Sequence, residues 1–203
     1  VRYTAMTALA HLTIDDWIDR ALYSDDPQTV MRALIPANYQ LTKNKPKWVL
    51  AAFDNLLQVD LSASDDELDF LRVVQLNAAI LNRDDPLLSK IGSHVLSTFP
   101  AKDRSVRWEQ AVVLGQLGVN EAFSVMLAEL LRESNYVTQF HMADCIADLA
   151  GGWTEAEQGQ LADWVLSTQS GWFAELDGKG RQFPGFWQTV MRDLVEQIGR
   201  AHV

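Results

Sequence analysis

The stretch from Phe123 to Arg132, FSVMLAELLR, gives the clearest indication of the fold class. Its large apolar side chains recur at intervals of three and four positions, and they are Phe123, Met126, Leu127, Leu130 and Leu131. This spacing places them on one face of a helix, because an α-helix has about 3.6 residues per turn. The stretch therefore predicts an amphipathic helix.

The same helical spacing recurs earlier in the chain, at Val49, Ala52, Phe53, Leu56 and Leu57. Two further stretches, residues 68–81 and 106–117, are apolar around most of the helical circumference, which is typical of helices packed between neighbours. No stretch shows the sustained alternation of apolar and polar residues that indicates a strand. We therefore predict an all-α protein of about ten or eleven helices.

Residues that favour helix ends indicate where these helices begin and stop. Ser24-Asp25-Asp26-Pro27 and Arg83-Asp84-Asp85-Pro86 each place an aspartate at the N-cap and a proline at the first helical position. Ser64-Asp65-Asp66-Glu67 has the spacing of a capping box and predicts a helix from about Asp65 to Asn82. Further starts are expected at Asp15 or Asp16, Pro46, Asp103, Asn120, Asn135, Thr154 and Pro184. Ends are expected at Gly118, at Gly151-Gly152 and at Gly171.

Short helices with short connections favour antiparallel neighbours, and internal similarity indicates a repeat. Val1-Arg2-Tyr3 recurs loosely as Val106-Arg107-Trp108, and the two Asp-Asp-Pro starts lie 59 residues apart. Both offsets fit a unit of about 30 to 40 residues, the size of a HEAT-like helical hairpin. We predict a HEAT-like α-solenoid of antiparallel helical hairpins that forms one domain over residues 1–203. Regular repeats would occupy residues 1–134, and divergent C-terminal repeats in 135–203 would cap the stack. The alternative is an irregular helical bundle.

The charge of the chain argues against nucleic acid as a partner. Lys and Arg number 17 against 27 Asp and Glu, and the resulting formal net charge of -10 repels phosphate backbones. Residues 108–178 hold 11 of the acidic residues and one basic residue, Arg132, whereas the rest of the chain holds 16 of each sign. If the protein binds a partner through charge, we expect a cationic protein to bind this acidic region.

Several classes of site lack their sequence signatures. Cys145 is the one cysteine, and neither CxxC nor CxxCH occurs, so that no zinc ribbon or covalent haem site is encoded. There is no glycine-rich phosphate loop, GxSxG or HExxH. There is also no run of about 18 apolar residues, which argues against membrane insertion. We therefore assign no catalytic, cofactor-binding or metal-binding residue and expect no cofactor. Because Val1 to Ala10 lack an initiator methionine and the basic region of a signal peptide, we expect a segment of a longer protein.

One predicted helix face carries four residues of types that bind metals. His141, Asp144, Cys145 and Asp148 are spaced i, i+3, i+4 and i+7. A catalytic zinc site needs three protein ligands and usually takes one from a different element, which nothing here supplies. We prefer the interpretation that His141 and Cys145 are half-buried packing residues and that the two aspartates lie toward solvent. A Cys145 nucleophile with His141 as its base is disfavoured, because neighbouring carboxylates disfavour the thiolate.

Aromatic residues are concentrated near the end of the chain. Trp172, Phe173, Phe183, Phe186 and Trp187 lie within sixteen residues that also contain three glycines. We expect these rings to cover the last hairpin, with Trp172 in a loop bounded by glycine. Aromatic rings also stack on sugars and form ligand cages, so that the cluster is a candidate binding surface. The candidate interaction surface comprises Trp172, Phe173, Phe183, Trp187, Asp144 and Asp148.

Residues 139–145, QFHMADC, followed by Leu149 and by Gly152-Trp153-Thr154, carry a family resemblance. They resemble the HEAT-like helical segments of very large secreted bacterial proteins. The resemblance continues through Trp164, Gly178 or Gly180, Phe183, Phe186 and Arg192-Asp193, and the opening residues look like an earlier repeat. It covers most of the chain and is strongest from Gln139 to Asp193, whereas residues 40–100 resemble HEAT repeats in general.

In that family the helical segment lies beside a β-propeller similar to sugar dehydrogenases, and a c-type haem domain commonly follows. The resemblance implies an extracytoplasmic, non-catalytic scaffold or docking segment of a larger redox protein, with adjacent domains of the parent chain as partners. It assigns oxidoreductase activity to no residue here, because the propeller and CxxCH are not in this chain. A ligand- or glycan-binding module that uses the aromatic cluster is the alternative. An enzyme with its site at His141 and Cys145 is the third hypothesis.

Overall fold

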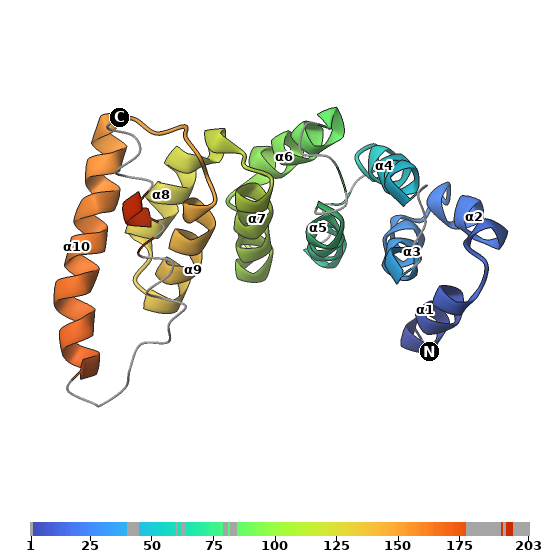
Figure 1. Cartoon of the computed structure of the whole chain (residues 1–203), viewed down its shortest axis with the longest axis horizontal. Coiled ribbons are helices and arrows are strands. Elements are labelled where there is room, and N and C mark those ends of the chain that lie inside the picture. The colour runs from blue at the N-terminus through green and yellow to red at the C-terminus, as the bar shows by residue number, and fades with distance from the viewer. Residues whose placement is uncertain are drawn as a thin grey trace. The chain divides into compact units, whose positions relative to one another are not determined.

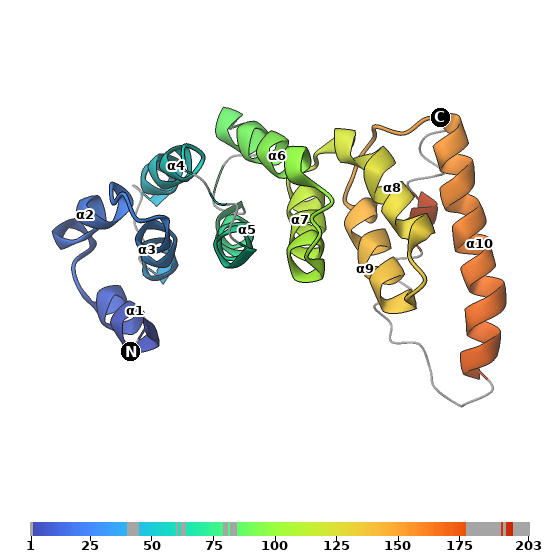
Figure 2. The same cartoon turned by 180° about the vertical axis from the view of Figure 1, so that it is seen from behind.

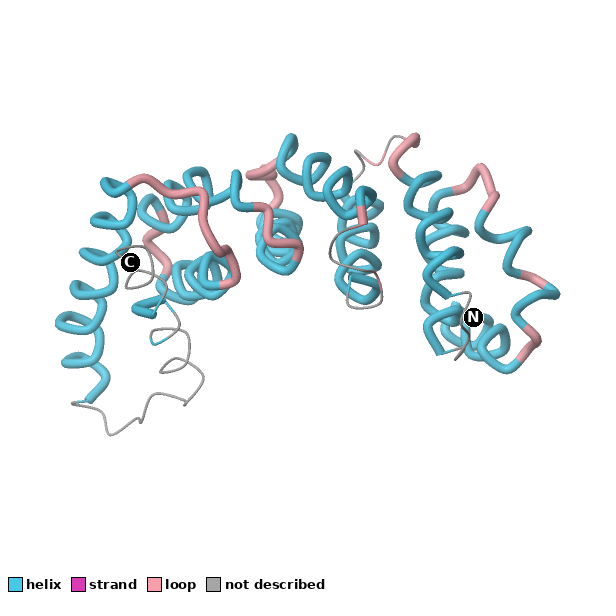
Figure 3. Tube along the Cα trace, turned by 45° about the horizontal axis from the view of Figure 1, so that its top comes forward, coloured by secondary structure: helices cyan, strands magenta, loops and turns pink. Residues whose placement is uncertain are grey.

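The computed structural model describes residues 2–39, 45–59, 61, 64–78, 81, 85–177, 192 and 194–196. These residues form ten α-helices and two short 3-10 helices, and none of them belongs to a strand (Figure 3). The prediction of an all-α protein is therefore confirmed. None of the helices in these ranges is both long enough and apolar enough to cross a membrane.

The chain divides into two compact units, unit 1 over Val1–Val113 and unit 2 over Leu114–Val203. Unit 1 contains α1 (Arg2–His11), η1 (Ile14–Asp16), α2 (Ile18–Leu22), α3 (Pro27–Tyr39), α4 (Lys45–Leu56), α5 (Ser64–Ala78), α6 (Pro86–Thr98) and most of α7 (Arg104–Gln116). Unit 2 contains the end of α7, η2 (Asn120–Ala122), α8 (Phe123–Arg132), α9 (Tyr136–Ala147) and α10 (Glu155–Asp177). A single solenoid over residues 1–203 stays a prediction.

Helices of unit 1 pack against helices that are close to them in the chain. α3 contacts its neighbours α2 and α4 and also the next helices but one, α1 and α5. α4 likewise contacts α2 and α6. Within this unit, α2, α4 and α6 lie in one layer, and α3 and α5 lie in a second (Figure 1). The apolar faces of both layers meet in a core that includes the fully buried side chains of Ile18, Leu34, Phe53 and Phe70.

Unit 2 is organised around α8, which packs against α9 and α10 (Figure 2). The ring of Phe123, at the start of α8, meets Trp153 edge to face with centroids 4.8 Å apart. Phe140 of α9 meets Trp164 of α10 in the same manner at 6.0 Å. Edge-to-face pairs of this kind stabilise a core beyond the apolar area that they bury. The FSVMLAELLR stretch forms a helix, as its amphipathic pattern predicts, and this helix contacts both α9 and α10.

Several predicted helix starts are confirmed by hydrogen bonds of the capping side chain. Asp85 accepts a bond of 2.9 Å from the backbone N–H of Leu87, and Asn135 accepts one of 3.0 Å from that of Val137. Asp103 caps α7 in the same way. The hydroxyl and the backbone N–H of Thr29 both donate to Asp26, and these bonds hold the pKa of the Asp26 carboxyl below its ordinary value. Side-chain caps satisfy backbone donors that have no partner within the helix.

The helix end predicted at Gly118 is also confirmed, whereas α9 ends at Ala147, before the predicted Gly151-Gly152. Gly118 has φ 65° and follows α7, and Gly152 has φ 88° in the connection after α9. Positive φ is the left-handed region that glycine adopts without steric cost.

Two other boundary predictions are wrong. α10 continues through Gly171 to Asp177, so that Trp172 lies in a helix and not in a glycine-bounded loop. A lone glycine costs a helix only about 1 kcal/mol relative to alanine, too little to end one that is held by packing. Asp15 and Asp16 lie within η1, and the following helix, α2, begins at Ile18. The tight turn lets Ile14 and Ile18 both reach the core, where they are 5% and 2% exposed. The start predicted at Pro184 lies outside the described residues.

Candidate functional site

The four residues of metal-binding types, His141, Asp144, Cys145 and Asp148, lie on α9 and directly after it. Cys145 is 4% exposed, His141 and Asp144 are half-buried, and Asp148, the C-cap residue, is exposed. The Sγ atom of Cys145 and the Nε2 atom of His141 are 3.9 Å apart, which is a weak contact. In the part of the chain that the structure describes, no group of three or more His, Cys, Asp or Glu side chains is placed to hold a metal ion.

The aromatic surface predicted near the end of the chain is placed only in part. Trp172 and Phe173 belong to α10, whereas Phe183 and Trp187 lie outside the described residues. Asp144 and Asp148 lie toward the C-terminal end of α9. Their grouping with the aromatic residues as one interaction surface stays a prediction.

The connection between α8 and α9 exposes apolar side chains in the acidic region. Leu131, Tyr136 and Val137 are 43%, 54% and 44% exposed, and we name these three residues the α8–α9 tip. Arg132, the one basic residue of residues 108–178, forms an ion pair with Glu129 at 2.5 Å. Glu129 therefore neutralises the charge of Arg132 within α8, and the other acidic residues of 108–178 leave the region with a net negative charge. The tip was not predicted: apolar spacing puts Leu131 on the apolar face of its helix, yet the residue is 43% exposed, because periodicity does not show how far a neighbour covers that face.

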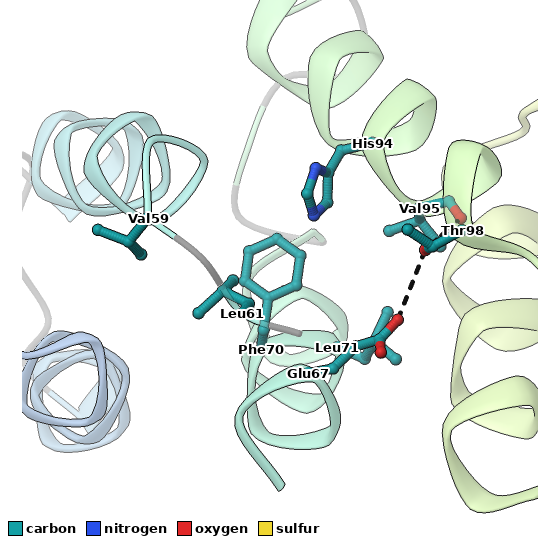
Figure 4. A pocket seen from close by; sticks show the side chains of 8 residues that line it. All are labelled: Val59, Leu61, Glu67, Phe70, Leu71, His94, Val95 and Thr98. Atoms are coloured by element: carbon teal, nitrogen blue, oxygen red, sulfur yellow. Dashed lines mark hydrogen bonds between the residues drawn. The ribbon is translucent and has the colours of Figure 1, made fainter. Parts of the chain in front are cut away.

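A pocket of about 160 Å³ lies in unit 1 between α5, α6 and the segment after α4 (Figure 4). Helix α5 contributes Glu67, Phe70 and Leu71, whose spacing places them on one face. Helix α6 contributes His94, Val95 and Thr98, and the chain after α4 contributes Val59 and Leu61. Figure 4 shows the His94 ring next to the Phe70 ring, and their centroids are 5.8 Å apart in an edge-to-face contact.

A hydrogen-bond network fixes the polar side of this pocket. The side-chain amide of Gln110, on α7, is fully buried and donates to Glu67 Oε1 at 2.8 Å and to Thr98 Oγ1 at 2.9 Å. Its Oε1 atom accepts a bond of 3.0 Å from the backbone N–H of Ala101. The Thr98 hydroxyl also contacts Glu67 Oε1, at 3.5 Å. The Glu67 carboxylate is therefore held in place at the pocket by groups from α6 and α7.

Sequence reasoning missed this pocket. It gave Glu67 a role in capping α5 and found no motif around His94. The spacing of Glu67, Phe70 and Leu71 does place them on one helix face, but the partners lie on other helices. Gln110 is 43 residues from Glu67, and no local pattern indicates such a pairing.

Comparisons with known proteins found no protein-family model that matches this chain, and no similar protein among curated proteins or among solved structures.

Proposed function

We propose that this chain is a non-catalytic helical-repeat scaffold that docks partner domains of a larger extracytoplasmic redox protein. The observation that carries the docking role is the α8–α9 tip, where Leu131, Tyr136 and Val137 expose apolar surface within an acidic region. Apolar side chains, tyrosine among them, form the cores of protein interfaces, and the surrounding charge selects and steers the partner. The expected partner is a protein domain with a cationic rim around an apolar contact.

The repeat architecture is supported by the way in which the helices pack. Among the contacts described above, α3 and α4 of unit 1 contact only helices that are one or two positions away in the chain. In unit 2, α8 contacts α9 and α10. Packing between near neighbours in the chain is the basis of helical-repeat proteins. Such a stack leaves its connections exposed along its length, where they are accessible to a partner. The redox and extracytoplasmic context comes from the resemblance of residues 139–193 to helical segments of secreted redox proteins.

A deletion in the full-length protein tests the docking role. If the segment positions a redox partner, removing residues 1–203 slows electron transfer between the adjoining domains. A triple variant, Leu131→Ser, Tyr136→Ser and Val137→Ser, reproduces most of that loss, because the three residues are exposed and their replacement leaves the core intact. Leu76→Ser is the matched control, since Leu76 is 56% exposed in unit 1. Electron transfer that is unchanged in the deletion would contradict the docking role.

A further inference from the structure

The pocket of unit 1 has the size of a small ring-shaped ligand. Its volume is about 160 Å³, and an apolar protein cavity of about 150 Å³ accommodates benzene. Five of the eight lining residues are apolar: Val59, Leu61, Phe70, Leu71 and Val95. A six-membered ring would contact these side chains and the edge of the Phe70–His94 pair, and aromatic pairs favour such edge contacts.

The polar side of the pocket determines the charge of the ligand. Glu67 is half-buried, and its Oε1 atom is occupied by Gln110 and Thr98. Within the described residues, nothing donates a hydrogen bond to its second oxygen. Among the residues that the structure describes, no Lys or Arg lines this pocket. A carboxylate beside an apolar surface attracts a cation and repels an anion more strongly than one in bulk water.

A metal ion does not fit this arrangement. Glu67 and His94 are the lining residues that commonly bind metals, and a zinc site takes at least three protein ligands. An apolar ring that carries an ammonium group fits both the apolar and the polar side of the pocket. The ring fills the cavity, and the N–H groups donate to the carboxylate. We propose that the pocket between α5 and α6 binds a small ring-containing amine, with the ring among Val59, Leu61, Phe70 and Val95 and the ammonium group on Glu67. This site goes beyond the docking role and does not depend on it, since the α8–α9 tip belongs to unit 2.

Three probes of similar size but different charge test the proposal: benzylamine, benzyl alcohol and benzoate. The methyl groups of Val59, Leu61, Leu71 and Val95 line the pocket and report binding in methyl NMR spectra of the full chain. We expect benzylamine to shift these signals saturably with a Kd of about 1 mM, since a ligand of this size makes few contacts. Benzyl alcohol should bind several-fold more weakly, and benzoate more weakly still. No saturable shift with benzylamine, or benzoate binding as tightly as benzylamine, would overturn the proposal.

Two variants separate the charge from the cavity. Glu67→Gln keeps an oxygen that accepts from Gln110 and Thr98 but removes the charge. It should weaken the binding of benzylamine about fivefold and leave the affinity for benzyl alcohol unchanged. Glu121→Gln, an exposed site in unit 2, is the matched control and should alter neither. Val59→Phe places a ring in the cavity from the half-buried chain after α4 and should weaken both probes. Benzylamine binding that is equal in the wild type and Glu67→Gln would overturn the charge assignment, and binding unaffected by Val59→Phe would overturn the location.

Discussion

The buried side chain of Gln110 donates a 2.8 Å hydrogen bond to the carboxylate of Glu67, 43 residues earlier in the chain. The same amide bonds to Thr98 and to the backbone of Ala101, so that one side chain joins α5, α6, α7 and the connection between α6 and α7. Gln110 is the fully buried member of this network, whereas Glu67 is half-buried and Thr98 is exposed, so that losing Gln110 removes one hydrogen-bond partner from each of the others.

Gln110→Leu should therefore destabilise the protein by about 2 kcal/mol, because Glu67, Thr98 and the Ala101 N–H each lose a partner. Urea unfolding followed by circular dichroism measures the change. Gln116→Leu, at the exposed end of the same helix, is the control and should change the free energy of unfolding by less than about 0.5 kcal/mol. Equal effects of the two substitutions would contradict a structural role for the network.

Filling the pocket of unit 1 should stabilise the fold. Val95 lines the pocket and is 2% exposed, so that Val95→Ile adds a methyl group in empty space and should raise the free energy of unfolding by about 0.5 to 1 kcal/mol. Val113→Ile adds the same group at a fully buried position outside the pocket and should lower it by about 1 kcal/mol. If thermal or urea unfolding shows that Val95→Ile is the less stable of the two variants, the space beside Val95 cannot hold an added methyl group.

Replacing each of three glycines of unit 2 by alanine should change the free energy of unfolding by amounts that differ in a predictable order. At Gly152, with φ 88°, an added Cβ atom would lie 2.0 Å from the backbone oxygen of Asn120, so Gly152→Ala should cost more than about 2 kcal/mol. Gly118 has φ 65° and open space around it, so Gly118→Ala should cost about 1 kcal/mol from backbone strain. Gly159 lies in α10 with nothing nearby, and Gly159→Ala should stabilise by about 0.5 to 1 kcal/mol. Equal changes in the free energy of unfolding for the three substitutions, measured with denaturant, would contradict these backbone conformations.

Glu157 should make unit 2 sensitive to acid. Hydrogen bonds from the Ser124 side chain and from Thr154 hold the pKa of the Glu157 carboxyl below its ordinary value of 4.5. A lowered carboxyl pKa stabilises the folded state fully above the ordinary value, and that contribution is lost as the pH falls through the folded-state pKa. Because Glu157 lies near the surface, Glu157→Gln should cost less than about 1 kcal/mol at pH 7, and the difference from the wild type should shrink below pH 4.5. A difference that stays constant from pH 7 to pH 3 would rule out this source of stability.

The helix positions were largely predictable because the signals that set them are local. A cap such as Asp85 acts on a backbone N–H two residues away, and Gly118, just after α7, adopts the positive φ that favours glycine. The error at Gly171 arose because a lone glycine disfavours helix by only about 1 kcal/mol, and α10 continues through it to Asp177.

The candidate sites were less predictable because they depend on contacts between helices. Glu67 has the position of a capping residue in the sequence, yet in the structure its carboxylate accepts hydrogen bonds from Gln110 and Thr98. Exposure of Tyr136 and Val137 depends likewise on how α9 meets α8. Apolar periodicity identifies a helix face but not the neighbour that covers it.

The most direct test of the docking role is a calorimetric titration of this chain with the adjoining domains that the proposal assigns to a larger protein, at about 50 mM and about 500 mM salt. We predict saturable binding that weakens at high salt, because the acidic excess of residues 108–178 attracts a cationic partner. Binding should also weaken in the Leu131→Ser, Tyr136→Ser and Val137→Ser variant. Absence of binding at both salt concentrations, or an affinity that does not change with salt, would contradict the account.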